Sequence, residues 1–377
     1  MPGLIFHQCL TKQALESNRI FDADELVKSY CAYPDFYYDE CSPEVKPYMY
    51  FHDGIQFHYP PHTPVEEFYR YWDRNGKGNY PFNHHSNENV IHVEAGFRFY
   101  LEKTVQLLKS GEREEAWKYL GCLLHFLEDS TFGVHALEGA DGTDLFVLDR
   151  LFGADMAKYL CSISLPEECK TMTVVPEIIS CDVSELVSLL YARYVRDTAK
   201  SRKYLFDMAV EQQYGKSHRP AEENIKLMFS VALQLTADAV ASVMAIVSGK
   251  KSGTNQRKLT DFSPFHYPIG GSGFALRKYE EQENTITFGV NSAASLLYSI
   301  PEKFYRYFFC MVCGTDIQQA TLHLINENEV VQTIEMENGM NYPVRIFFPG
   351  GTFGFRIESS NLSGKISISG GQFYSVE

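Results

Sequence analysis

The chain has no excess of positive charge. Its 377 residues include 34 lysines and arginines but 48 aspartates and glutamates, which gives a formal net charge of −14. Proteins that grip nucleic acid by neutralising its phosphates need clustered Lys and Arg, so the composition argues against a nucleic-acid partner. A bound divalent cation escapes this objection, because it can hold a phosphate inside an otherwise acidic protein.

A signal peptide, a continuous membrane span and a disulfide framework are also missing. Residues 1–10 have no basic flank followed by an apolar run, although a chain trimmed at its start would look the same. Gln234, Thr236 and Asp238 interrupt the most apolar long stretch, which predicts a buried core helix over residues 227–247. Nine cysteines without regular spacing indicate reduced thiols. We therefore expect a cytoplasmic protein, or a secreted one if its start has been removed.

The length exceeds what one hydrophobic core usually serves, so two domains are expected. Residues 31–90 form a Pro-, Tyr- and His-rich region without regular spacing. Around it, apolar residues at helical spacing predict helices at 11–30, 92–109, 112–129, 143–160, 183–213 and 220–248. The sequence GKKSGTNQRKLTD, which begins at Gly249, is polar and has no periodicity, as is typical of a linker. Short runs rich in β-branched and aromatic residues follow it, separated by Gly, Asn and Pro. We predict a multidomain α + β protein, with an all-α domain at 1–249, a linker at 250–261 and an all-β sandwich at 262–377.

The segment from Glu114 to His135, EEAWKYLGCLLHFLEDSTFGVH, contains the residues best suited to chemistry. Its leucines recur at helical spacing, which predicts a helix packed on the core. His125 and Asp129 are four residues apart and therefore share a face of that helix. An imidazole and a carboxylate so placed can grip a divalent metal, with His135 as a third ligand just past the helix end. The alternative is a simple hydrogen bond between His and Asp, the commoner outcome of this spacing alone.

The stretch LGCLLHFLEDSTFGVH resembles the signature of the zinc-dependent phospholipase C and single-strand nuclease superfamily. That signature has Leu-Gly, then His, three residues, Asp, five residues and His, and this chain matches it at Leu120, Gly121, His125, Asp129 and His135. The resemblance implies that Asp129 bridges two zinc ions, that His125 binds one of that pair, and that His135 binds a third.

Two further segments extend the resemblance. GLIFHQCLTKQAL is similar to the opening of family members, where a histidine near the N-terminus binds zinc, and this implies His7 as a ligand. For His7 alone, a capping or partly buried histidine is an equal alternative. MYFHDG resembles the segment of a family carboxylate that binds metal and acts as general base, which implies both roles for Asp53. Asp35 and Asp39 lie nearby and leave this assignment open.

One departure from the family pattern is Arg70, which stands where the family has a ligand histidine. A guanidinium cannot bind zinc because it stays protonated. His58 or His62, in the FHYPPH run, could replace the missing ligand if this loop has been remodelled.

A second departure follows His135, because the next histidine in the chain is His218. Asp149 falls at the spacing of the missing family histidine and is predicted as a metal ligand, while Gly153 stands where the family has a carboxylate. A site of one histidine and carboxylates would be weaker for zinc and would tolerate harder metals. Glu138, Asp141 and Asp144 are alternative oxygen ligands in this stretch.

The resemblance implies a metal-dependent phosphodiester hydrolase, most of all a phospholipase C, with two or three zinc ions. In such an enzyme a metal-activated water attacks phosphorus, and the cations stabilise the pentacoordinate oxyanion. The expected substrate is phospholipid or another phosphodiester before nucleic acid. One alternative is a phospholipase C-like fold with weakened or lost activity that serves as a binding or scaffolding protein. A further alternative is a single-strand nuclease.

The C-terminal stretch TITFGVNSAASLLYSIPEKFYRYFFCMVCGTD resembles the NPCBM type of carbohydrate-binding sandwich. The order of a helical domain and a sandwich also resembles clostridial toxin phospholipases, whose sandwich is a PLAT-like module that docks on membranes. The resemblances imply a glycan or a membrane surface as partner of the sandwich. A structural or protein-binding sandwich is the alternative.

Overall fold

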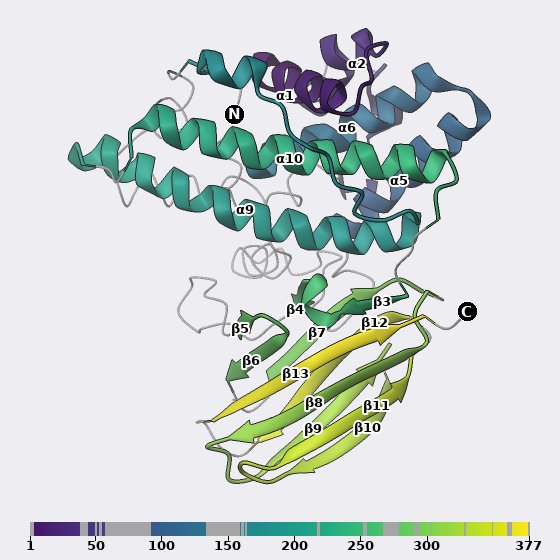
Figure 1. The fold of residues 1–377 in the computed structure, drawn as a ribbon, viewed down its shortest axis with the longest axis vertical. Helices are drawn as coiled ribbons and strands as arrows, with labels where there is room; N and C mark the ends of the chain where they lie inside the picture. The colour runs from purple at the N-terminus through teal and green to yellow at the C-terminus, as the bar shows by residue number, and fades with distance from the viewer. Residues whose placement is uncertain are drawn as a thin grey trace. The chain divides into compact units, whose positions relative to one another are not determined.

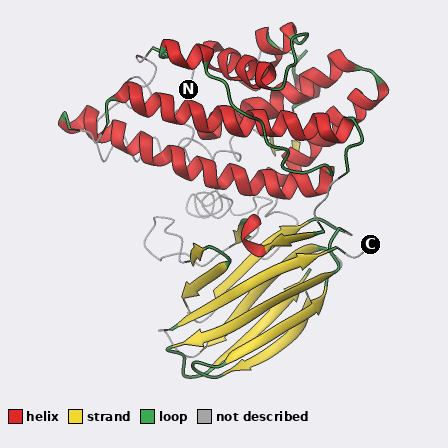
Figure 2. Ribbon diagram, in the orientation of Figure 1, coloured by secondary structure: helices red, strands yellow, loops and turns green. Residues whose placement is uncertain are grey.

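The computed structural model describes residues 4–37, 44–49, 51–52, 55–56, 92–132, 159, 162, 164–216, 219–251, 255–266, 279–289, 294–302, 304–327, 329–348, 350–359 and 364–375. These residues fall into two compact units, one up to Lys251 and the other from Ser252 onward. The first consists mainly of helices and the second mainly of antiparallel strands (Figures 1 and 2). The predicted fold class, a helical domain followed by a β-sandwich, is confirmed.

The helical unit agrees with the apolar periodicity of the sequence. The helices predicted at 92–109, 112–129, 183–213 and 220–248 are confirmed, with ends that differ by one or two residues. The first helix begins and ends earlier than the predicted 11–30, and the helix predicted at 143–160 lies almost wholly outside the described residues. Its described elements are α1 (Leu4–Ser17), α2 (Asp24–Lys28), η1 (Tyr30–Ala32), α3 (Tyr33–Tyr37), η2 (Lys46–Tyr48), β1 (Phe51–His52), β2 (Ile55–Gln56), α5 (His92–Ser110), α6 (Arg113–Thr131), η6 (Glu167–Thr171), α9 (Val183–Tyr214) and α10 (Ala221–Val247).

Helix α6 lies at the centre of this unit and contacts α1, α5, α9 and α10. Its residues from Leu120 to Thr131 are all buried, so the second half of the helix is enclosed on every side. A helix buried all round is normally apolar all round. The polar residues His125, Glu128 and Asp129 in this half therefore need partners inside the protein.

Helix α10 is long and apolar enough to cross a membrane, judged by length and composition. However, 67% of its most apolar window is buried inside the protein. Asp238, in the middle of the helix, is fully buried, and its Oδ2 accepts a hydrogen bond from Arg193 Nη2 at 2.9 Å. This is the buried core helix that the interrupted apolar stretch predicts.

Gly121 lets the chain before α3 approach α6 closely. A Cβ atom at this position would lie 2.5 Å from the carbonyl oxygen of Tyr30, a distance that real side chains do not reach. The small residue therefore allows η1 to rest directly on α6. This contact places Cys31 and the following helix α3 beside His125.

The sandwich consists of two antiparallel sheets. One sheet has the strand order β10-β9-β12-β7-β4, and the other has the order β11-β8-β13-β6-β5, with β3 also paired to β13. Its elements are β3 (Gln256–Lys258), η7 (Leu259–Asp261), β4 (Pro264–His266), β5 (Tyr279–Gln282), β6 (Thr285–Gly289), β7 (Ala294–Ile300), β8 (Tyr307–Thr315), β9 (Ala320–Asn326), β10 (Glu329–Met336), β11 (Asn341–Phe347), β12 (Gly351–Ser359) and β13 (Lys365–Tyr374).

Aromatic rings from both sheets meet in the core of the sandwich. Phe308 of β8 and Phe373 of β13 come from one sheet, and Phe353 of β12 comes from the other. The ring centroids of Phe308 and Phe353 are 4.6 Å apart, and those of Phe353 and Phe373 are 5.5 Å apart. All three side chains are fully buried, so the period-2 alternation of the strands points one apolar face of each sheet inward.

Part of the stretch predicted as a linker, residues 250–261, belongs to the sandwich. β3 pairs with β13, and η7 follows it directly. Leu259 in η7 and Phe262 just after it are buried, which anchors a segment whose other residues are mostly polar. The domain boundaries themselves stay predictions.

The close contact at Gly121 can be tested by Gly121→Ala. In an exposed helix, alanine would be favoured over glycine, but here the added methyl group must push against the backbone of Tyr30. We expect the variant to lose about 1–3 kcal/mol of unfolding free energy, as overpacked cores do. Thermal or urea unfolding of the helical unit measures this. Gln106→Ala, at an exposed site on α5, is the control and should change little; equal stability of both variants would contradict the close contact.

Candidate metal centre

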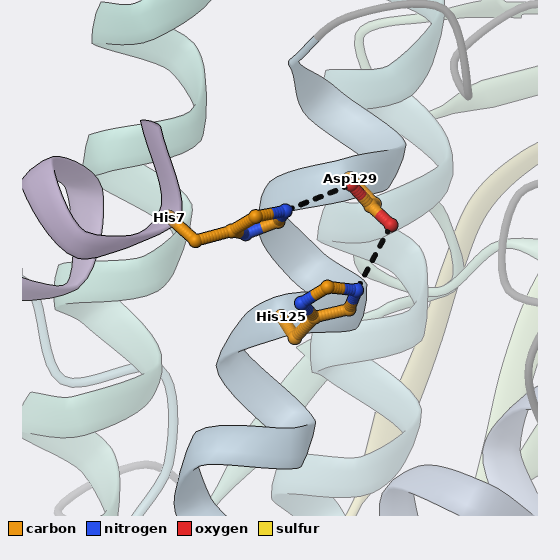
Figure 3. A group of neighbouring side chains, drawn as sticks. All are labelled: His7, His125 and Asp129. Carbon is orange, nitrogen blue, oxygen red and sulfur yellow. Dashed lines mark ion pairs between the residues drawn. The ribbon is translucent and has the colours of Figure 1, made fainter. Parts of the chain in front are cut away.

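Three polar side chains from two helices meet in the core of the helical unit. His7 comes from the start of α1, and His125 and Asp129 come from successive turns of α6 (Figure 3). Each side chain is no more than 1% exposed. Each of the three offers one potential ligand atom, and these atoms all lie within 4.8 Å of one another.

The carboxylate of Asp129 is shared between the two imidazoles. Its Oδ1 lies 3.2 Å from Nε2 of His7, and its Oδ2 lies 3.2 Å from Nε2 of His125. The two rings are stacked, with centroids 4.1 Å apart and an interplanar angle of 17°. Figure 3 shows both rings presenting their Nε2 edge to Asp129. The two Nε2 atoms and the two oxygens of Asp129, which are the atoms suited to bind a metal, therefore lie together.

The opposite nitrogen of each ring is held by an acceptor. Nδ1 of His125 lies 2.8 Å from the carbonyl oxygen of Cys31, and Nδ1 of His7 lies 2.8 Å from Oε2 of Glu128. A carbonyl oxygen and a carboxylate accept a proton donor but do not supply one, so Nδ1 of each ring carries the hydrogen. In a neutral ring, Nε2 then presents its lone pair toward Asp129. Histidines that bind metals have this arrangement almost without exception.

The electrostatics of the pocket require positive charge. Burial lowers the pKa of His7, but its hydrogen bonds and charge interactions with Asp129 and Glu128 outweigh burial and raise it to about 10. Burial raises the pKa of Glu128, against the opposing effect of His7 and Thr11. Two buried carboxylates beside two imidazoles thus need a cation, which can be a proton on His7 or a divalent metal ion.

The donor set fits zinc. Zinc binds imidazole nitrogen and carboxylate oxygen at about 2.0–2.2 Å, and two tetrahedral ligands at that bond length are separated by about 3.3 Å. The distances of 3.2 Å from each Nε2 to an Asp129 oxygen agree with this spacing. A lone pair facing a carboxylate at this distance is repulsive unless a cation lies between them.

Asp35 adds a carboxylate that the sequence motifs did not assign. Its Oδ1 lies 3.7 Å from Nε2 of His125, is buried, and makes no hydrogen bond to a described residue. The side chain itself is 19% exposed, so it borders the pocket. The sequence signal was the run YPDFYYDE close after the first helix, whose acidic residues competed with Asp53 for the family carboxylate.

The structure brings together three of the predicted ligands, His7, His125 and Asp129. The other three, Asp53, His135 and Asp149, lie outside the described residues and stay predictions. Also outside are Arg70, the candidate replacements His58 and His62, and Gly153.

No protein-family model matches the sequence, and no curated protein is significantly similar to it. Among solved structures, the alpha-toxin from Clostridium absonum aligns with 96% of this chain and 84% of its own, at 11% identity and a TM-score of 0.36. The alpha-toxin from an avian strain of Clostridium perfringens aligns with 72% of this chain and 60% of its own, at 12% identity and a TM-score of 0.20.

A third similar structure contains the tandem CBM51 modules of a family 98 glycoside hydrolase from Streptococcus pneumoniae. The match covers 32% of this chain and 47% of that one, at 12% identity and a TM-score of 0.26. The chain thus spans about half the length of this structure. All these TM-scores are too low to establish a shared fold, so the fold assignment depends on the helices and sheets described above.

Zinc should stabilise the helical unit if the pocket holds it. At a free zinc concentration about 100 times the Kd, binding to the folded state adds about 2.7 kcal/mol to the unfolding free energy. We expect the unfolding midpoint to rise with zinc, to fall again with a chelator, and to stop responding in His125→Ala. His323→Ala removes a histidine that lies beside Glu358 in the sandwich and should keep the response. A parent protein whose midpoint ignores zinc would refute a metal pocket here.

Proposed function

We propose that the helical unit is a metal-dependent phosphodiester hydrolase of the phospholipase C type. The observation that carries this proposal is the sharing of the Asp129 carboxylate between Nε2 of His7 and Nε2 of His125. A bridging carboxylate with one imidazole on each oxygen is suited to a site with more than one metal ion. The sequence resemblance to zinc-dependent phospholipases C supports the same chemistry.

The residues of the chain have distinct tasks in this proposal. His7, His125 and Asp129 would hold the metal ions, which supply an activated water and positive charge for the phosphorane-like transition state. The Cys31 carbonyl holds the ring of His125, and Glu128 holds the ring of His7. Asp35, at the border of the pocket, would accept a proton from the attacking water at Oδ1. Asp53, the general base that the resemblance implies, is the other candidate for that task.

Phospholipid is the proposed substrate, with zinc as the metal and the cytoplasm as the location. The net charge of −14 is unfavourable for drawing a polyanionic nucleic acid to the surface, which ranks a nuclease below a phospholipase. A scaffolding role with a weakened site is the competing proposal. It is favoured by Arg70 and by the missing histidine after His135.

Metal content and hydrolysis should depend together on Asp129. We expect the purified protein to carry two or more zinc ions per chain by mass spectrometry, and to hydrolyse phosphatidylcholine vesicles or a chromogenic phosphodiester. Asp129→Asn should lose metal and at least about a hundredfold in kcat/KM, since a bridging ligand is removed. Asp35→Asn should keep most metal and lose activity.

The matched control is Asp22→Asn, which alters an exposed carboxylate of the same unit that pairs with Arg113. It should retain both metal and activity. Cleavage of single-stranded DNA alone would identify a nuclease instead. A protein that takes up no zinc at neutral pH would contradict the hydrolase proposal and favour the scaffolding role.

The sandwich partner can be proposed from an aromatic patch on one sheet. Tyr307 and Phe309 of β8, Phe347 of β11 and Tyr374 of β13 lie on the face of their sheet that points away from the core. Arg345 stacks over the rings of Tyr307 and Phe309, and the Phe347 side chain is 63% exposed. Aromatic rings with an arginine among them suit the headgroup region of a lipid bilayer. We propose a membrane surface as the partner, in accordance with a phospholipid substrate.

This patch should contribute to vesicle binding. Phe347→Ser should reduce co-sedimentation with phosphatidylcholine vesicles severalfold, because it removes the most exposed ring of the patch. The control is Val331→Ser, at a site that is 45% exposed on β10 in the other sheet. Equal loss in both variants, or binding to a glycan array instead of vesicles, would contradict a lipid role for the patch.

A further inference from the structure

Glu128 is a buried charged residue that the proposed mechanism above does not need as a ligand. It precedes Asp129 on α6 and is 0% exposed. Its Oε2 lies 2.8 Å from Nδ1 of His7, and its Oε1 accepts a hydrogen bond from Oγ1 of Thr11 at 2.7 Å. Both oxygens are therefore engaged by side chains of α1.

The two contacts of Glu128 fix α1 at two points. His7 and Thr11 are four residues apart on α1, so they lie on the same face of that helix, one turn apart. A carboxylate that bonds to both prevents α1 from rotating or sliding relative to α6 at this level. Burying a carboxylate is costly unless it is paired and hydrogen-bonded. Among the described residues, both side chains that bond to the Glu128 carboxylate belong to the helix that supplies His7.

The two imidazoles of the pocket consequently differ in their outer partner. His125 donates from Nδ1 to the neutral carbonyl oxygen of Cys31, whereas His7 donates to a carboxylate. An anionic acceptor on Nδ1 makes Nε2 of the same ring a more basic ligand than a neutral acceptor does. The pocket is therefore asymmetric, with the stronger nitrogen donor on α1.

We propose that Glu128 is a positioning residue that makes His7 the stronger of the two histidine ligands. It does so by accepting the Nδ1 hydrogen, which presents Nε2 to the metal, and by holding the ring through its contact with Thr11. This inference rests on the proposed function only in assuming that the pocket binds a metal ion. It assigns Glu128 no contact with metal or substrate.

Metal affinity provides one test. Zinc affinity, measured by competition with a chromophoric chelator, should fall about 10- to 100-fold in Glu128→Ala, the range typical of lost outer partners of metal ligands. Glu128→Gln should recover part of this loss, because the amide oxygen still accepts from Nδ1 but carries no charge. Thr11→Val leaves Glu128 in place and should weaken binding less. The control is Thr131→Val, which alters a buried threonine whose hydroxyl donates only to the Leu127 carbonyl oxygen.

The tautomer of His7 provides a second test, which a purely structural role would not change. Long-range ¹⁵N–¹H NMR on the zinc-loaded protein should show hydrogen on Nδ1 of His7 in the parent and in Glu128→Gln. In Glu128→Ala that signal should exchange rapidly or disappear, while the signal of His125 stays. Circular dichroism identifies any variant that fails to fold, and Thr11→Val supplies the milder perturbation in that case.

The outcomes separate the two proposals. A parent that binds no zinc overturns the proposed function and this inference with it. A parent that binds zinc with the same affinity as Glu128→Ala, with an unchanged His7 tautomer, overturns the role of Glu128 alone.

Discussion

The shared carboxylate of Asp129 is the interaction on which the helical unit is organised. It links the ring of His7 on the first helix to the ring of His125 on the central helix, 118 positions later in the sequence, inside a core with almost no solvent. Such a polar cluster is unfavourable unless each atom is matched, since buried charge costs far more than buried apolar surface stabilises. The surrounding contacts supply that match: Glu128 for His7, and the Cys31 carbonyl for His125.

Packing provides the geometry for these contacts. Because Gly121 has no side chain, the backbone of Tyr30 rests directly on α6. The carbonyl oxygen of the next residue, Cys31, then lies within hydrogen-bond distance of His125, one turn further along α6. Asp35 reaches the pocket through the same short segment. A single small residue thus decides whether a backbone acceptor and a carboxylate can approach the histidines.

Part of this arrangement could be predicted from the sequence. Amphipathic spacing predicted the long helices, and β-branched runs predicted the strands, because both patterns repeat within a few residues. His125 and Asp129 were visible as a pair four residues apart, whereas His7 became a candidate only through its resemblance to a family. Asp35 was visible only as one of two acids that left the assignment of Asp53 open. Glu128 was missed for a physical reason, since it looks like an ordinary polar residue until α1 is packed on α6. The contact with the Cys31 carbonyl could not be predicted, because every residue has a carbonyl group and the sequence does not distinguish this one. Leu259 was overlooked because a single apolar residue in a mostly polar stretch forms no periodic pattern.

The position of His7 near the beginning of α1 has a further consequence. It is the fourth residue of α1, in the first turn, where the backbone amides of a helix lack intrahelical acceptors. One of the two rings that face Asp129 thus stands on the part of α1 that has the fewest backbone hydrogen bonds of its own. Side-chain contacts inside the pocket therefore hold this turn in place of the missing backbone hydrogen bonds, and a bound cation would add to them.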